Sequence, residues 1–134
     1  MSMFDANDLV SSYSRAQAIE DGDLVDVTET AREAGFRFPV ALTAAVWADC
    51  VAWTDEDTRR KRVPQDEAGR LWDVVWMAML AARRAGNTDR VAYEILRVPL
   101  AGGGRRARPV RLVMRIGPGD TPAPVITITT PDED

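Results

Sequence analysis

The hydrophobic period of this chain changes about two thirds of the way along, and that change restricts the folds it can adopt. Over residues 65–85, apolar residues recur every three or four positions, which is the spacing of a helix with one buried face. Over residues 111–116, Leu112, Met114 and Ile116 alternate with residues that include two arginines, which is typical of a strand with one wet face. Helices that precede a run of strands predict an α+β fold rather than repeated βαβ units.

Capping and turn residues indicate the limits of the other elements. Ser14 and Thr28 are suited to cap short helices, and Gly22 and Gly35 are suited to end them. Pro39 is suited to the first turn of a third helix, in which apolar residues recur at helical spacing. We therefore expect helices over residues 15–20, 28–33, 40–53 and 65–85, a short extended piece at 24–27, a charged connection over 54–62, and strands over 91–100, 109–116 and 123–130.

The length of 134 residues and the hydrophobic fraction of 46% are ordinary for one globular domain with one core. We expect a single domain over residues 1–134, in which a helical N-terminal half packs on a three- to four-stranded antiparallel sheet from the C-terminal half. The four tryptophans are expected to pack together as core, with interface anchoring as the alternative. The expected core comprises Trp47, Trp53, Leu71, Trp72, Val75, Trp76, Leu112 and Met114.

The location is expected to be cytoplasmic. No apolar run approaches the roughly 20 residues that cross a bilayer, so no membrane partner is expected. Cys50 is the only cysteine, which fits a reducing compartment. The start of the chain carries Asp5 and Asp8 and lacks the basic and apolar pattern of a signal peptide.

The net charge of −4 conceals three blocks of opposite sign. Residues 1–58 hold twelve acidic and three basic side chains, a charge of −9, whereas residues 59–115 hold fourteen basic and five acidic side chains, a charge of +9. Residues 116–134 add −4. Either the blocks fold against one another and neutralise, or they create local fields on the surface.

The residue types exclude several kinds of catalysis. The chain has no histidine, which excludes serine and cysteine triads that use histidine, and zinc sites with histidine ligands. Cys50 lies on the apolar side of a predicted helix, where core packing is expected. The run Gly102–Gly104 lacks the Lys-Ser/Thr ending of a phosphate-binding loop. We therefore expect no catalytic residue, cofactor or metal.

Two polar clusters remain as candidate sites. Asp21, Asp23 and Asp26 crowd one turn, which is expected to be a solvated acidic surface because the spacing does not match a calcium loop. Tyr13 and Arg15 stand beside the expected cap Ser14 and Gln17, and capping accounts for part of that cluster.

An arginine-rich hairpin is the third candidate. A loop with three arginines could grip phosphates or an acidic protein surface, and the alternative is that the charges only protect exposed strand edges. The arginines of the first two predicted strands and their loop are Arg97, Arg105, Arg106, Arg108, Arg111 and Arg115.

The sequence resembles a family of small bacterial proteins found on plasmids, phages and other mobile elements. The segments that carry the resemblance are residues 13–27, 31–36, 39–43, 46–47, 119–120 and 125–128. The resemblance implies no activity, cofactor or catalytic residue. It implies a context in which small accessory proteins bind host or rival machinery, including anti-restriction and anti-CRISPR inhibitors.

The leading functional hypothesis is a non-enzymatic binding protein, a counter-defence inhibitor that docks on a host or rival protein or nucleoprotein complex. In it, the acidic first half, which includes Asp21, Asp23 and Asp26, presents carboxylates to a nucleic-acid-binding channel, and the arginine hairpin meets acidic groups elsewhere. One alternative is an enzyme on nucleotides or nucleic acid that uses Tyr13, Ser14 and Arg15 beside the turn over residues 21–26. Its polar cluster, short helix and glycine resemble the opening of ADP-ribosyl-transferring folds, without the histidine usually found there. Another is direct nucleic-acid binding through the hairpin. The sequence leaves the oligomeric state open.

Overall fold

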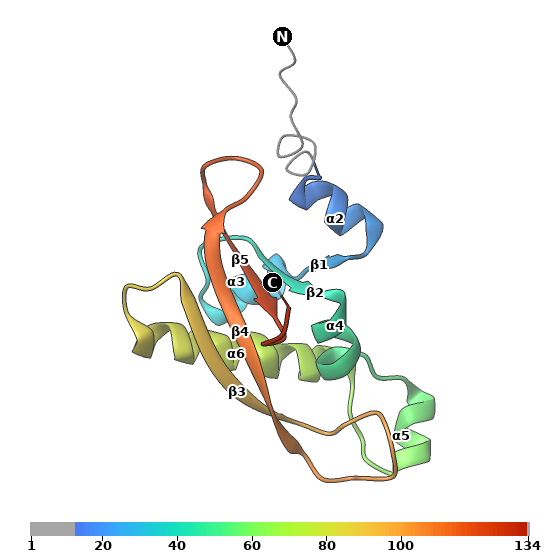
Figure 1. The fold of residues 1–134 in the computed structure, drawn as a ribbon. Coiled ribbons are helices and arrows are strands. Elements are labelled where there is room, and N and C mark those ends of the chain that lie inside the picture. The colour runs from blue at the N-terminus through green and yellow to red at the C-terminus, as the bar shows by residue number, and fades with distance from the viewer. Residues whose placement is uncertain (1–12, 134) are drawn as a thin grey trace.

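The structure, a computed structural model, describes residues 13–133 and has a mixed α+β fold (Figure 1). None of the helices in that range combines the length and the apolar character that a membrane crossing requires. In chain order the elements are α2 (Arg15–Asp21), β1 (Leu24–Asp26), α3 (Thr28–Ala34), β2 (Val40–Thr43), α4 (Ala44–Val46), the π-helix η1 (Trp47–Val51), α5 (Asp55–Lys61), α6 (Glu67–Ala85), β3 (Arg90–Arg97), β4 (Arg108–Pro118) and β5 (Pro124–Thr129).

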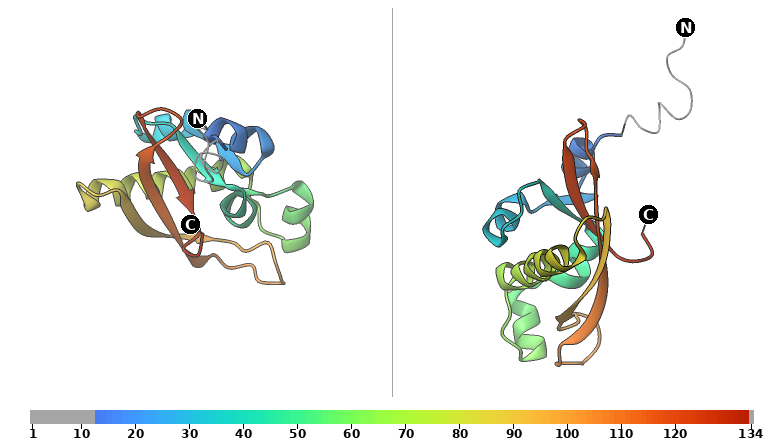
Figure 2. Two further views of the ribbon diagram at one scale, coloured as in Figure 1. Left: turned by 45° about the horizontal axis from the view of Figure 1, so that its top comes forward. Right: turned by 90° about the vertical axis from the view of Figure 1, so that its left-hand side faces the viewer.

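The strands form one five-stranded sheet in the order β1-β2-β5-β4-β3. The three C-terminal strands are antiparallel neighbours, as the alternation in sequence predicts. The N-terminal half adds β1 and β2, and β2 pairs with β5 in parallel. The α+β class is confirmed, but the sheet is mixed and has five strands instead of the expected three to four antiparallel ones, because the N-terminal half, expected to be mainly helical, contributes two of them. Helices α3 and α6 lie on one face of the sheet, which we call the inner face (Figure 2).

The predicted helix over residues 40–53 is wrong in its first turn, which is strand β2. Val40, Ala41 and Leu42 are fully buried and lie between β1 and β5. A short, wholly apolar run fits a central strand covered on both faces, but its period does not distinguish it from a buried helix. The helical part begins only after Thr43, whose hydroxyl accepts a hydrogen bond from the amide of Val46.

The charged connection predicted over residues 54–62 is instead helix α5. Thr54 and Asp57 form a capping box, in which each side chain accepts a hydrogen bond from the main-chain amide of the other. The first turn is acidic and the last turn is basic, so both charges are favourable in the helix dipole. The charge of this segment by itself predicts a loop.

The expected core is partly confirmed. Val75, Leu112 and Met114 are fully buried on the inner face, and Trp53 is also buried. The remaining expected core residues only pack against the core from its margin, and the stacked rings of Trp72 and Trp76 lie there with centroids 5.7 Å apart. The prediction of four clustered core tryptophans is therefore wrong. Those margin residues are Trp47, Leu71, Trp72 and Trp76.

The other face of the sheet, which we call the outer face, is less exposed to solvent than the alternation of apolar and polar residues predicts. Glu133 returns over this face, where its carboxylate accepts a hydrogen bond from Thr43 Oγ1 (2.7 Å) and its carbonyl accepts one from Arg115 Nη2 (3.2 Å). Val113 and Thr129 lie opposite each other in register and are buried. The chain after β5 thus covers the middle of the outer face.

Arg70 occupies the position on α6 where the sequence pattern favours an apolar residue. Its side chain is buried, and it donates hydrogen bonds to the carbonyls of Val51 (3.1 Å) and Val98 (2.9 Å). A third, longer contact reaches the carbonyl of Asp49 (3.3 Å). The guanidinium also lies over the ring of Trp53, 4.8 Å from its centroid. One side chain therefore joins η1, α6 and the end of β3.

Replacement of Arg70 by methionine should destabilise the fold by about 3 kcal/mol or more, because the carbonyls it binds would lose their partners in a buried setting. Urea unfolding followed by circular dichroism measures the effect. The control is Arg83→Met, which removes an exposed arginine from the same helix and should change stability by about 0.5 kcal/mol at most. A loss of about 0.5 kcal/mol or less for Arg70→Met, no larger than that of the control, would contradict the structural role.

Candidate functional site

The acidic turn is held together by Tyr13. The hydroxyl of Tyr13 lies 2.7 Å from Asp23 Oδ2 and 3.0 Å from Asp21 Oδ2. The hydrogen bond to Asp23, with a smaller contribution from Asp21, raises the pKa of the Tyr13 phenol above its ordinary value. Asp26 is used locally, since it accepts hydrogen bonds from the amide and the hydroxyl of Thr28. Each predicted carboxylate of this turn thus has an internal partner.

The remaining members of the Tyr13 cluster also have structural contacts. Ser14 forms a capping box with Gln17, as the sequence indicates. Arg15 reaches across β5 and donates hydrogen bonds to Thr127 Oγ1 and to the carbonyl of Ile126, both at 2.7 Å. Asp120 accepts hydrogen bonds from the first amides of α2. These contacts fix α2 to the sheet.

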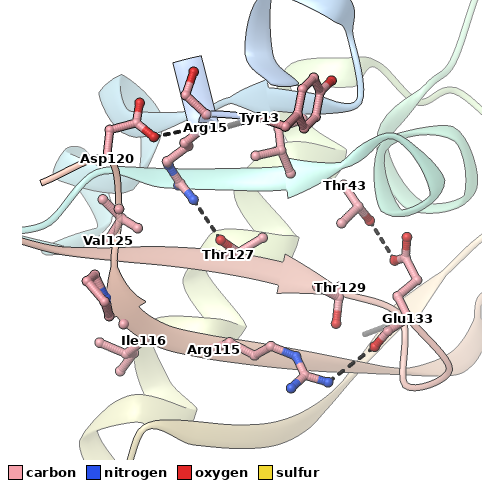
Figure 3. Close-up of a pocket in the computed structure, with 15 residues that line it drawn as sticks. Tyr13, Arg15, Thr43, Arg115, Ile116, Asp120, Val125, Thr127, Thr129 and Glu133 are labelled. Carbon is pink, nitrogen blue, oxygen red and sulfur yellow. Dashed lines mark hydrogen bonds between the residues drawn. The ribbon is translucent and has the colours of Figure 1, made fainter. Parts of the chain in front are cut away.

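A concavity of about 660 Å³ lies between this cluster and Glu133 (Figure 3). Figure 3 shows Arg15 directed at Thr127 from one side, and Arg115 directed at Glu133 from the other. The Nε atom of Arg115 is buried without a hydrogen-bond partner in the described part of the chain. Hydrogen bonds across the concavity connect α2 and Glu133 to the sheet and to Asp120, so its polar side chains are largely engaged in holding these segments in place.

The structure does not hold the arginines of the predicted hairpin in one cluster. Arg97 is mostly buried and pairs with Asp49, with Nη2 3.0 Å from Oδ1. Arg115 lies seven residues along β4 from Arg108, a distance of roughly 24 Å, and is engaged by Glu133. Arg111 is exposed on the outer face. Of the six candidate arginines, only Arg105, Arg106 and Arg108, which we call the loop arginines, therefore remain together and free of the contacts that engage Arg97 and Arg115.

Those loop arginines meet the basic end of α5, which the sequence did not single out. Figure 1 shows α5 beside the loop between β3 and β4, at the end of the molecule away from α2. Arg60 donates hydrogen bonds to the carbonyls of Leu100 (2.8 Å) and Gly102 (3.4 Å), and the buried Lys61 donates to that of Pro99. We call the resulting surface the cationic lobe, and it comprises Arg59, Arg60, Lys61, Arg62, Arg105, Arg106 and Arg108.

Two shallow depressions lie on the cationic lobe and share Gly103 and Arg105. One is lined by Arg105, Arg106 and Arg108, and the other by Arg62, Arg105 and the end of α5. A Cβ atom added to Gly103 or Gly104 would meet no atom within 4 Å, so the main chain of the loop is open to an approaching group. The surface offers guanidinium groups around a bare backbone.

The charges at the tip of the lobe are not neutralised within residues 13–133. In that range the ion pairs are Arg59–Glu56, Arg60–Asp57 and Arg97–Asp49. The exposed arginines of the lobe that take part in none of them are Arg62, Arg105, Arg106 and Arg108.

Arg62 also has an unfavourable backbone conformation. It ends α5 at φ 57°, the left-handed region that favours glycine, and it is the only non-glycine residue with positive φ in the described range. Such a conformation costs about 1 kcal/mol and persists where the surroundings or a function require the side chain. The lobe therefore keeps a guanidinium where the fold alone favours glycine.

Cys50 is buried at 1% exposure and lies in the core, as the sequence predicts. Burial, with a smaller contribution from the nearby Asp49, raises the pKa of the Cys50 thiol to about 12. Because the thiolate is the nucleophile, this side chain is unreactive near neutral pH.

Iodoacetamide at pH about 8.5 should label native Cys50 at least a hundredfold more slowly than the urea-unfolded chain, because burial suppresses the thiolate. Intact mass against time measures both rates. Since the pKa of the folded state is raised, the thiol contributes stability below pH 9 that is lost as the pH rises toward 12. Labelling of the native protein at the unfolded rate would show that Cys50 is accessible.

Comparison with known proteins identifies a family. No curated protein and no solved structure matches the chain. The sequence matches a family of unknown function, DUF6573, along residues 1–134. The chain therefore belongs to the family of unknown function DUF6573.

Proposed function

We propose that this protein is a non-enzymatic binding protein whose cationic lobe docks on the phosphate backbone of a nucleic acid or nucleoprotein. The observation that carries the proposal is the group of exposed arginines at the tip of the lobe, Arg62, Arg105, Arg106 and Arg108, which have no ion-pair partner within residues 13–133. Charged side chains that only solubilise a strand edge need no such gathering from two distant segments.

Phosphate fits the chemistry of the lobe better than a protein surface does. Guanidinium groups bind phosphate oxygens through two parallel hydrogen bonds, and the bare Gly103–Gly104 backbone allows close approach. Arginines also anchor protein interfaces, but there tryptophan and tyrosine are enriched beside them. The large hydrophobic side chains exposed in the described range lie outside the lobe: Tyr13, Phe38, Met77 and Leu96.

The lack of aromatic side chains in the lobe also favours one mode of binding. Without rings for base stacking, the contacts would be to the backbone and largely independent of base sequence. The acidic turn around Asp21 and Asp23 lies at the other end of the molecule and would repel phosphate, which restricts binding to the lobe.

The partner class follows from the sequence resemblance to mobile-element proteins. A host or rival nucleoprotein complex would present phosphate to the lobe, and a counter-defence inhibitor of the anti-restriction or anti-CRISPR type would act by occupying it. The alternative hypotheses draw less support. Asp21, Asp23, Asp26, Tyr13 and Arg15, on which acidic docking and enzymatic chemistry depend, all have internal partners.

Binding to a short DNA duplex of arbitrary sequence should weaken by roughly a hundredfold between about 50 and 200 mM salt, since four arginine contacts give a slope near −3.6 in log K against log salt. Replacement of Arg105, Arg106 and Arg108 by alanine should reduce that slope to about −1. Fluorescence anisotropy measures both.

The matched control removes three exposed arginines outside the lobe, Arg32, Arg37 and Arg83, and should keep the steep salt dependence. Polyglutamate serves as an anion without phosphate. Equal affinity for polyglutamate and duplex would contradict the phosphate preference. If binding survives the lobe variant but is lost when Asp21, Asp23 and Asp26 are changed to lysine, the acidic surface is the interface.

Arg62→Gly should separate stability from binding. Glycine relieves the left-handed backbone, so the unfolding free energy should rise by about 0.5–1 kcal/mol, while affinity for the duplex falls through loss of one phosphate contact. Arg62→Ala is the control, because it removes the same charge without relieving the backbone. Urea unfolding and anisotropy on the same samples test this. An Arg62→Gly protein that binds as tightly as the parent would remove Arg62 from the site.

A further inference from the structure

Among the described residues, 13–133, strand β3 is a free edge of the sheet. The strand order ends at β3, which pairs with β4 on one side. It runs eight residues, Arg90–Arg97, without a proline or an interruption of the ladder. A long, regular and unpaired edge is a template for another strand. The main-chain N–H and C=O groups along that edge are therefore able to bond to a partner strand.

The ladder shows which main-chain groups point away from β4. Ile116 donates its amide to the carbonyl of Asp89 (2.8 Å), so this pair and every second pair along the antiparallel register are the hydrogen-bonded ones. Val91, Tyr93 and Ile95 therefore bond inward to β4. The residues whose amides and carbonyls face the open side are Arg90, Ala92, Glu94 and Leu96.

We propose that the β3 edge binds a second copy of this chain, antiparallel, with Ala92 opposite Ala92 of the partner subunit. This register places Arg90 opposite Glu94 of the partner subunit, and Glu94 opposite Arg90 of the partner subunit. Opposite charges at directly facing positions stabilise a strand pair. A two-fold axis through Ala92 keeps the helices of both copies on the same side and makes the interface self-complementary.

Neighbouring registers lack this complementarity. A slide of one strand by two residues places Arg90 opposite Leu96 and leaves Glu94 opposite Ala92. A slide by four residues places Glu94 opposite Glu94, a like-charge pair that is unfavourable. Registers shifted by an odd number of residues would place residues whose amides face the open side opposite residues whose amides already bond to β4, so no ladder could form. The charge pattern of β3 thus selects one register.

An apolar groove lies at the same point of the edge. It is a cavity of about 530 Å³ between α6 and β3, lined on the strand side by residues 91–94. The two-fold axis through Ala92 would bring the α6 helices of both copies toward each other over this groove and cover its apolar walls. The α6 residues that line it are Met77, Leu80, Ala81, Arg84 and Ala85.

Sedimentation velocity of the purified full chain at increasing concentration tests the proposal, with a monomer–dimer equilibrium as the expected result. Glu94→Arg alone, or Arg90→Glu alone, should raise the dimer dissociation constant by about tenfold or more, because each puts like charges opposite each other twice. The double variant Arg90→Glu/Glu94→Arg should restore the parent value within a few-fold, since it reverses both pairs in this register.

Ala92→Pro provides a second route that leaves the monomer folded. The amide of Ala92 points away from β4, so proline removes a hydrogen bond to the second copy and none within the sheet. We expect a monomer with the circular dichroism of the parent. A parent that stays monomeric at its solubility limit, a proline variant that still dimerises, or a double variant that fails to restore the dimer would each overturn the proposal.

Discussion

The buried guanidinium of Arg70 is the interaction on which the arrangement of the functional surface depends. It binds the carbonyls at the end of the π-helix and the carbonyl of Val98, just beyond β3. Lys61 then binds the carbonyl of Pro99, and Arg60 that of Leu100. Three basic side chains thus hold three successive carbonyls where the chain leaves the sheet. The loop arginines reach their place beside α5 because this segment is fixed.

The basic residues at the end of α5 therefore have different roles. Arg60 and Lys61 point to the loop backbone and hold it, whereas Arg62 stands at the open side of the lobe in a conformation that the fold does not favour. An arginine-rich loop without such support would lose conformational freedom on binding, and that loss weakens affinity. In this protein part of the loop's conformational freedom is already lost on folding, because the carbonyls of residues 99, 100 and 102 have hydrogen-bond partners in the unbound chain.

Sequence alone predicted the elements whose hydrophobic period fits only one type of secondary structure. Helix α6, the three C-terminal strands and the buried Cys50 were predictable because long amphipathic segments fit only one type of element. Strand β2 was not, because its apolar residues occupy both faces of a central strand. Helix α5 could have been found from its Thr54–Asp57 capping box, which its charge obscured. Arg70 left no signal, since one arginine in an apolar stripe normally reads as solvated.

The candidate site, too, could be predicted only in part from the sequence. The loop arginines were identified from composition, but a list of charges does not say which are neutralised. Arg97 found Asp49, 48 residues away, and Arg115 found the carbonyl of Glu133, whereas Arg105, Arg106 and Arg108 have no ion-pair partner in the described range. Which arginines stay free is decided by where β3 and β4 end, and that depends on long-range pairing.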